Sequence, residues 1–302
     1  MGSPTVTILV TTKNRKDELG VALDSCVNQA GVNEVFVLDD GSDDGTYEYV
    51  QENYPSIRIE RQEESLGVIR ARNYGVERAK SDVVITIDDD CVFQNNDVIG
   101  KLVEELYEDD RVWAVTIPSI DVKINPDRVI QKSPGEDAIY LGSAYRGGCH
   151  AVKRELFVGN GSYYGEMVRQ GEESDICMRM IGKGYFVRLG NSGMLHHYES
   201  PVRNYKVIAH YNVRSNMLVM WRNIPMPIYM VHGLVTLLNL LKFCVKKKQF
   251  KSFFTGLFSS LGVILSGKAG RQSMTIQHYH LFEAIKRGKV KTLDEAVAWL
   301  EH

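Results

Sequence analysis

Residues 83–90 read Val-Val-Ile-Thr-Ile-Asp-Asp-Asp, an apolar run that is closed by three consecutive acids. A run of β-branched residues predicts a buried strand. Carboxylates crowded at one strand end repel each other, and they become favourable when a divalent cation lies between them. Side chains two positions apart on an extended segment point the same way, so Asp88 and Asp90 could share one metal ion. Taken alone, the pattern also fits an acidic turn after a strand.

Strands and helices alternate on both sides of this stretch. The sequence predicts strands at residues 5–11, 34–38 and 57–60, and helices at 16–29, 46–53 and 67–79. Such alternation is typical of a parallel sheet with helices on both faces. Ligands of these sheets bind beyond the carboxyl ends of the strands. Polar clusters follow three of the strands, at residues 11–15, 39–42 and 88–90, which favours a ligand site over a simple acidic turn.

The bulk composition excludes several classes of protein. A chain of 302 residues can hold one large domain, or a domain with an appendage. The formal net charge of -2 gives no general positive field, so no nucleic-acid partner is expected. Five scattered cysteines without a C-x-x-C pair suit a reduced, cytoplasmic protein. The chain enters an apolar strand within its first residues and shows no signal peptide, which also favours the cytoplasm.

Four motifs in this order resemble glycosyltransferase family two. They are Thr-Thr-Lys-Asn-Arg at 11–15, Leu-Asp-Asp-Gly-Ser at 38–42, Ala-Arg-Asn at 71–73, and the three acids at 88–90. The resemblance covers roughly residues 5–225. It implies the glycosyltransferase-A fold, an α/β Rossmann-like mixed sheet with helices on both faces. The expected catalytic domain is 1–225, with a donor half at about 1–110 and an acceptor half at about 111–225, followed by a helical region at 226–302.

The resemblance also implies a donor site for a nucleotide sugar. Asp39 would accept a hydrogen bond from the N3–H of uracil or thymine, which points to UDP or dTDP. Asp39 could instead cap the loop that follows it, and Arg72 could lie on a solvated helix face. Asp90 and Asp88 would hold Mn or Mg, a hard cation that suits oxygen ligands and stabilises the departing diphosphate. The expected nucleotide-binding residues are Thr11, Thr12, Asn14, Arg15, Asp39, Asp40, Arg72, Asp88 and Asp89.

The acceptor half carries two further motifs. Gly147 and Gly148 resemble the family's segment beneath the sugar, where glycine lets backbone approach a ligand, although they could form a plain turn. Residues 171–175 read Gly-Glu-Glu-Ser-Asp and resemble the family's Glu-Asp motif, with Arg179 expected near the same pocket. Glu173 replaces the motif's Asp and would be the general base, with Glu172 and Asp175 as alternatives. These acids could also simply favour the start of a helix.

A histidine pair follows another short predicted strand. In relatives, a histidine in this place can complete the metal site. Adjacent residues on a strand cannot both face one ion, and His196 rather than His197 is the predicted ligand.

The C-terminal third is apolar and basic. The stretches 228–245 and 253–265 flank Lys246, Lys247, Lys248 and Lys251. Spanning a bilayer needs about twenty predominantly apolar residues, and the first stretch reaches that length only with polar interruptions. We expect peripheral contact of 228–265 with the cytoplasmic face of a membrane. Packing on the catalytic domain, or on a second subunit in a homodimer, is the alternative.

These observations predict an inverting, metal-dependent hexosyl- or deoxyhexosyltransferase. The acceptor is expected to be a lipid-linked or cell-surface glycan. The absence of a Gln-x-x-Arg-Trp motif favours addition of one or a few sugars over polymer synthesis. A sugar-1-phosphate nucleotidyltransferase should carry a glycine-rich loop after the first strand, and residues 11–15 contain no glycine. A non-catalytic protein that binds nucleotide sugars is the other alternative.

Overall fold

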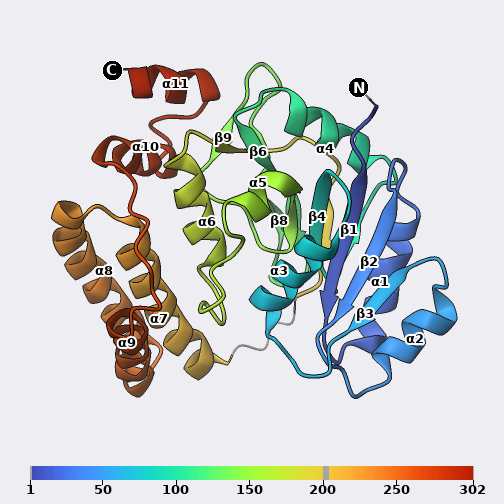
Figure 1. Cartoon of the computed structure of the whole chain (residues 1–302), viewed down its shortest axis with the longest axis horizontal. Coiled ribbons are helices and arrows are strands. Elements are labelled where there is room, and N and C mark those ends of the chain that lie inside the picture. Colours follow the sequence, from blue (N-terminus) through green and yellow to red (C-terminus); the bar gives the residue numbers. More distant parts are fainter. Residues whose placement is uncertain (1, 200–203, 302) are drawn as a thin grey trace.

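The computed structural model describes residues 2–199 and 204–301, and its centre is an eight-stranded mixed sheet (Figure 1). In sheet order the strands are β3 (Arg58–Arg61), β2 (Glu34–Asp39), β1 (Val6–Thr12), β4 (Val83–Asp88), β10 (Cys149–Lys153), β6 (Val112–Thr116), β11 (Phe186–Arg188) and β9 (Leu141–Gly142). Strands β1 to β4 run parallel, whereas β10 runs antiparallel between β4 and β6. The sheet is therefore mixed, as the family resemblance implies, and the alternation of strands and helices predicts only its parallel half.

A second, smaller sheet lies beside the carboxyl end of β4. Its strands, in order, are β5 (Cys91–Phe93), β12 (Leu195–His197), β7 (Ser119–Asp121) and β8 (Asn125–Ile130). The register pairs His197 with Cys91 on one side and with Asp121 on the other. The small sheet thus brings His197 beside Cys91, the residue directly after Asp90, and brings Asp121 to the other side of His197.

Helices cover both sides of the main sheet (Figure 1). They are α1 (Lys16–Val27), α2 (Thr46–Asn53), α3 (Val68–Arg78), α4 (Val98–Tyr107), α5 (Arg154–Gly159) and α6 (Glu172–Ile181). Helix α3 lies close against β1, since a Cβ added to Gly75 would come within 2.6 Å of the Leu9 side chain. This contact fixes α3 over the sheet, with its first turns near the strand ends.

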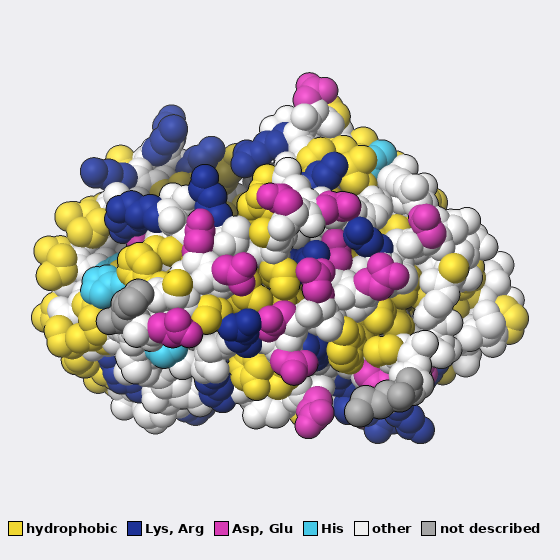
Figure 2. All heavy atoms as spheres, turned by 90° about the horizontal axis from the view of Figure 1, so that it is seen from above, with side chains coloured by type: hydrophobic (Ala, Val, Ile, Leu, Met, Phe, Trp, Pro, Cys, Tyr) yellow, Lys and Arg dark blue, Asp and Glu magenta, His cyan; other side chains and the backbone are white. Residues whose placement is uncertain are grey.

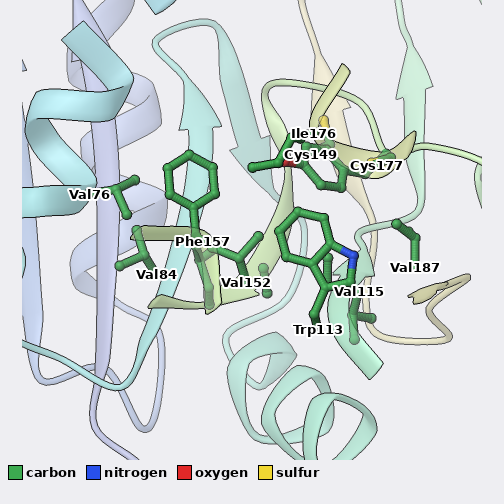
Figure 3. Close-up of a cluster of buried hydrophobic side chains, with 14 of the residues drawn as sticks. Val76, Val84, Trp113, Val115, Cys149, Val152, Phe157, Ile176, Cys177 and Val187 are labelled. Atoms are coloured by element: carbon green, nitrogen blue, oxygen red, sulfur yellow. The ribbon is translucent and has the colours of Figure 1, made fainter. Parts of the chain in front are cut away.

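The hydrophobic core continues from the sheet to α6 (Figure 3). Trp113, Val152 and Ile176 are buried in one cluster, and Phe157 of α5 joins them. Cores pack at the density of organic crystals, so this cluster sets the position of α6 relative to β10. The start of α6, which carries the predicted base, is thereby held over the sheet edge.

The C-terminal third forms two separate groups of helices. Helices α7 (Tyr205–Asn223), α8 (Met226–Lys246) and α9 (Phe250–Leu265) stand beside the main sheet, with α8 outermost (Figure 1). Arg214 Nε of α7 donates to Ser259 Oγ of α9 at 2.9 Å. Helices α10 (Ile276–Lys286) and α11 (Leu293–Glu301) return to the segment before β9, where Leu293 N donates to Ile139 O at 2.9 Å.

Candidate functional site

Three polar loops meet at the carboxyl edge of the main sheet. Strand β1 lies between β2 and β4, and its register pairs Thr12 with Asp39 and Thr11 with Asp88. Parallel strands that end at the same level bring the loops after them together. The structure places the following predicted donor residues at this edge: Thr11, Thr12, Asn14, Arg15, Asp39, Asp40, Asp88 and Asp89.

Asp39 is fully buried, and only one of its two carboxylate oxygens has a hydrogen-bond partner. Its Oδ1 accepts from Ser42 N at 2.8 Å, so the capping role is present. Its Oδ2 has no hydrogen-bond partner and lies 3.8 Å from Arg61 Nε. A buried polar atom without a partner is costly, and a ligand N–H would satisfy it.

Asp40 and Asn14 hold the loops in place. Asp40 accepts from Ser65 Oγ at 2.6 Å and from the backbone N–H groups of Leu66 and Gly67, so both its oxygens serve the loop before α3. Asn14 Oδ1 accepts from Asp43 N at 2.9 Å, and its own N–H donates to Ser42 Oγ at 2.9 Å. Both residues therefore hold the loops at the sheet edge from within.

Asp89 contacts residues of the loop after β1. It accepts from Thr12 Oγ1 at 2.8 Å and lies 3.2 Å from Arg15 Nε. Burial raises the pKa of Asp89 to about 7 although Arg15 opposes the shift. Asp89 thus ties the first loop to the third, and Asp88 is the most exposed of the three acids.

Asp90 is surrounded by cationic groups. Arg15 Nη2 lies 2.9 Å from one carboxylate oxygen and His197 Nε2 lies 3.1 Å from the other. Burial disfavours the ionised form, but the hydrogen bond and charge of His197, together with Arg15, lower the pKa of Asp90. His197 Nδ1 lies 2.8 Å from Asp121, to which Arg146 Nη2 donates at 2.7 Å. Burial alone would lower the pKa of His197. The neighbouring carboxylates of Asp90 and Asp121 outweigh this effect and raise the pKa of His197 to about 9.

His197, and not the predicted His196, lies in the group of side chains that could hold a metal ion. On β12 the side chains alternate, and Leu195 and His197 are the buried ones. His196 is only partly buried, and its ring makes an edge contact with Tyr198 at 6.4 Å. The alternation was visible in the sequence, since the histidine on the side of buried Leu195 is His197.

The donor atoms at this edge fit a hard divalent cation. Ligand atoms of Asp88, Asp90, Cys91 and His197 all lie within 4.8 Å of one another. A hydrogen bond with Cys149 and burial raise the pKa of the Cys91 thiol, and a sulfur ligand is softer than a hard cation prefers. The remaining set has two carboxylates and the His197 imidazole, which would release its proton on binding a cation and whose other nitrogen faces Asp121, the arrangement that orients a metal-binding histidine.

Glu172 and Glu173 begin α6 across from these acids. Glu172 is buried, with one oxygen 3.5 Å from Arg72 Nη1 and the other without a partner. Glu173 is less enclosed, and burial together with the charge of Glu172 raises its pKa to about 8. A carboxylate that takes up a proton near neutral pH has the properties of a general base.

Asp175 and Arg179 lie outside the predicted reaction site. Asp175 is fully buried and accepts from Arg179 Nε at 3.0 Å, Arg222 Nε at 2.8 Å and Asn223 Nδ2 at 2.8 Å. Arg179 also donates to Ser162 O at 2.6 Å. Residues four apart on a helix share a face, and here that face is the interior side of α6. This network joins α6 to α7, which corrects the expectation that Asp175 is an alternative base and that Arg179 lines the sugar pocket.

Gly147, Gly148 and Arg72 connect the two groups of acids. A Cβ on Gly147 would lie 2.5 Å from Glu173 Oε1 and 2.6 Å from Arg72 Nη1, and one on Gly148 would overlap Asp88. Arg72 is buried and pairs with Asp88 through Nη2 and with Glu172 through Nη1. The two glycines are therefore needed for close approach, and Arg72 lies at the site rather than on a solvated helix face.

Sequence reasoning missed the layer beneath Glu173. His150 stacks on Tyr145 at 3.9 Å between ring centroids, and its Nε2 lies 3.3 Å from Tyr163 OH. Burial and the neighbouring Arg72 lower the pKa of His150 to about 3, so it is neutral. Asn73 fixes Tyr163 by two hydrogen bonds to its backbone, of 2.7 and 2.9 Å. The Ala-Arg-Asn motif was the only sequence signal for this layer.

Comparison with known proteins gives one family. Residues 7–160, just over half of the chain, match the family described as glycosyl transferase family 2. Glycosyltransferase AglE of Haloferax volcanii is 29% identical over 94 residues, which cover 29% of this chain and 31% of AglE. Most of AglE therefore lies outside the match.

Solved structures of low sequence identity share the fold. The mannosyltransferase PcManGT from Pyrobaculum calidifontis, solved with GDP-Man and Mn2+, has a TM-score of 0.58 at 18% identity, over 99% of this chain and 87% of that one. GalNAc-T7, solved with UDP, GalNAc and Mn2+, has a TM-score of 0.57 at 20% identity, over 71% of this chain and 48% of that one.

Proposed function

Because the chain belongs to glycosyl transferase family 2 and has the glycosyltransferase-A fold, we propose that it is an inverting, metal-dependent hexosyl- or deoxyhexosyltransferase. It moves one sugar from a nucleoside-diphosphate donor to an acceptor hydroxyl. One observation carries the proposal: Glu173 lies against Gly147 and Arg72, and Arg72 pairs in turn with Asp88 of the metal group. The base and the cation site are thus neighbours through a single buried arginine.

The donor nucleotide is UDP or dTDP. Asp39 Oδ2 is buried and without a partner, and an ionised carboxylate can only accept hydrogen bonds. Uracil and thymine offer an N3–H to such an acceptor, whereas cytosine presents a bare ring nitrogen at that position. Arg15 adds positive charge beside the acids, where the diphosphate would lie.

Asp88, Asp90 and His197 would hold Mn2+ or Mg2+. When bound, the cation supplies Lewis-acid stabilisation of the charge that builds on the departing nucleoside diphosphate. Asp121 keeps the His197 ring oriented with Nε2 toward Asp90. The protein thus holds the atoms that would bind the metal at one point of the sheet edge.

Glu173 takes the proton from the acceptor hydroxyl. Its pKa, raised to about 8, makes it a stronger base than an ordinary carboxylate once it is ionised. The activated oxygen attacks the anomeric carbon on the side away from the diphosphate. A single in-line displacement inverts that carbon and needs no protein nucleophile. The acceptor is a lipid-linked or cell-surface glycan.

Calorimetric titration of UDP and dTDP, each with and without Mn2+, tests this function. We expect binding that requires Mn2+ and that Asp90→Ala abolishes. Asp127→Ala removes an exposed carboxylate on β8 and serves as the matched control, with unchanged binding expected. If neither nucleotide binds with Mn2+, or if Asp90→Ala binds normally, the proposed donor site is wrong.

A further inference from the structure

The distribution of charge along the chain is strongly uneven. Between Glu199 and Glu283 the sequence has 11 lysines and arginines and no aspartate or glutamate. The rest of the chain has 25 basic and 38 acidic residues. The near-neutral total therefore hides a basic segment that includes α7, α8 and α9. Such a segment is attracted to anionic surfaces.

Helix α8 exposes an apolar face. Met230, Val231 and Leu234 are 70, 69 and 60% exposed. The exposed positions recur one and four residues apart, so they form one stripe along the helix. From the first turn onward this stripe contains Met226, Met230, Val231, Leu234, Val235 and Leu238. Surface helices of soluble proteins place charged residues on this side, and α8 does so only at its end, with Lys242 and Lys246.

Helix α9 adds aromatic side chains. Phe250, Phe254 and Phe258 recur every four residues and are exposed, and neighbouring rings contact each other at centroid distances of 5.0 and 6.4 Å. Leu265 at the end of the helix is 84% exposed. Figure 2 shows hydrophobic side chains gathered at the end of the molecule that the C-terminal helices form. Contiguous exposed apolar surface of this kind marks a contact site.

Lysines gather where α8 meets α9. Lys246, Lys248 and Lys251 are exposed, and Lys247 lies over the Tyr205 ring at 4.1 Å. Long basic side chains beside an apolar helix face can reach phosphate groups while the apolar groups enter the lipid. The corner between the two helices therefore combines both kinds of membrane contact.

The inner face of α8 packs on neighbouring helices. Of the described helices, α8 is the one with the length and composition of a membrane span. Its Leu240 and Cys244 are nevertheless buried in a cluster with Ala209, Val213 and Phe253. His232 Nδ1 lies 2.6 Å from Tyr279 OH of α10. A spanning α8 would lose these contacts, so an orientation in the plane of the membrane preserves the fold.

We propose that α8 and α9 lie in the interface of an anionic lipid bilayer, with the apolar stripes inserted and the lysine corner on the phosphates. A second copy of this chain fits the same face poorly. A twofold interface brings the same patch of both copies together, and this segment offers no acid to pair with the opposing lysines. Insofar as the proposed transferase function holds, the bilayer also presents a lipid-linked acceptor to the enzyme.

Co-sedimentation of the full chain with vesicles tests the proposal. We expect binding to vesicles of phosphatidylcholine with phosphatidylglycerol, weaker binding to phosphatidylcholine alone, and weakening by salt. Replacing Lys246, Lys248 and Lys251 by Gln should lower partitioning by at least about tenfold. The matched control replaces Lys80, Lys123 and Lys132, which are exposed on the catalytic domain, and should bind as the wild type does.

A second pair of variants isolates the apolar contribution. Met230→Gln with Leu234→Gln should also lower partitioning at least about tenfold, while Val21→Gln with Ile124→Gln should not. All four side chains are exposed, so thermal unfolding should stay unchanged. Equal binding to both vesicle types, or no binding to either, overturns the proposal. If the Met230 and Leu234 changes instead dissociate a dimer, the face contacts a second copy.

UDP binding with Mn2+ separates this proposal from the transferase function. Both variant sets should keep it, because none of the changed residues is at the sheet edge. If a variant loses vesicle binding but keeps nucleotide binding, the changed residues act only in the membrane contact of α8 and α9. Vesicle binding without any nucleotide binding would remove the proposed function and leave the surface.

Discussion

Two groups of carboxylates face the same site and have opposite electrostatic surroundings. Asp90 lies within 3.1 Å of both Arg15 and His197, and these cations lower its pKa against the effect of burial. Glu173 is enclosed beside Glu172, and burial with this like charge raises its pKa to about 8. The surroundings favour the ionised form of Asp90 and the protonated form of Glu173, as the roles proposed for them require. The environment, not the residue type, assigns the two roles.

Arg72 is the group that both sides share. It pairs with Asp88 on the metal side and with Glu172 on the base side, and it is 6% exposed. Its charge is thus already engaged by two carboxylates. This leaves Glu173 with little compensation, which agrees with the raised pKa of Glu173. The contrast between the two acidic groups therefore depends on one cation.

The largest expected effect comes from removing the base. Glu173→Gln keeps the shape of the side chain but cannot accept the proton, so kcat should fall by about 10²–10⁴-fold. Binding of UDP with Mn2+ should remain, because Glu173 is not among the donor-side residues. Glu173→Asp restores the residue that the family motif carries and should retain measurable turnover. Steady-state kinetics with the donor and an acceptor glycan check this, and full turnover in Glu173→Gln would refute the base assignment.

Removing the guanidinium of Arg72, which pairs with both groups of acids, should mainly destabilise the protein. Arg72→Met leaves the buried Glu172 and the partly buried Asp88 without their partner, and the free energy of unfolding should fall by about 3–5 kcal/mol. Arg70→Met on the same helix is the matched control. Arg70 pairs with Glu166 at the surface, so its loss should cost at most about 1 kcal/mol. Urea denaturation of both variants gives the comparison, and equal losses would show that Arg72 has no special role.

A smaller effect is expected from the residue that orients His197. Asp121→Asn weakens the hold on the imidazole, and Mn2+ affinity in the presence of UDP should fall about 10–100-fold. Asp127→Asn changes an exposed residue of the neighbouring strand and should leave the affinity unchanged. Calorimetry measures both affinities. Unchanged binding in Asp121→Asn would mean that His197 does not hold the cation.

The meeting of the polar loops at the sheet edge could be predicted from sequence because it depends on local order. Thr12, Asp39 and Asp88 each end an apolar run, and parallel neighbours stop in register. The fold of the first half follows from the same alternation of strands and helices. The insertion of β10 between β4 and β6 does not, since no local pattern specifies which strands pair across the chain.

The position of His197 and the inner layer were harder to predict. His197 meets Asp90 through strands of three residues, whose register is set by tertiary contacts. Asp175 has the residue type of a base, yet its spacing to Arg179 places both on the inner face of α6. Helical periodicity could have separated Asp175 from Glu173. No sequence pattern marks His150 or Tyr163, because their role depends on packing beneath Arg72.

The smallest expected effect is a shift in the pH dependence of kcat, and it tests the contrast between the two groups of carboxylates most directly. Because Glu173 has a raised pKa, it is protonated and inactive at low pH, and kcat should rise with pH around a midpoint near about 8. The raised pKa of Glu173 also links its protonation to stability. Its stabilising contribution is fully present below pH 4.5, the ordinary pKa of a glutamate, and is lost as pH rises toward about 8. Glu172→Gln removes the like charge, so the midpoint of the kcat profile should move to lower pH.

The decisive measurement is therefore the pH dependence of kcat in the wild type and in Glu172→Gln, at saturating Mn2+ and donor. The account predicts a rising limb near pH 8 that shifts downward in the variant and is absent from the residual activity of Glu173→Gln. A limb that stays in place in Glu172→Gln, or persists in Glu173→Gln, would contradict the assignment of Glu173 as the base.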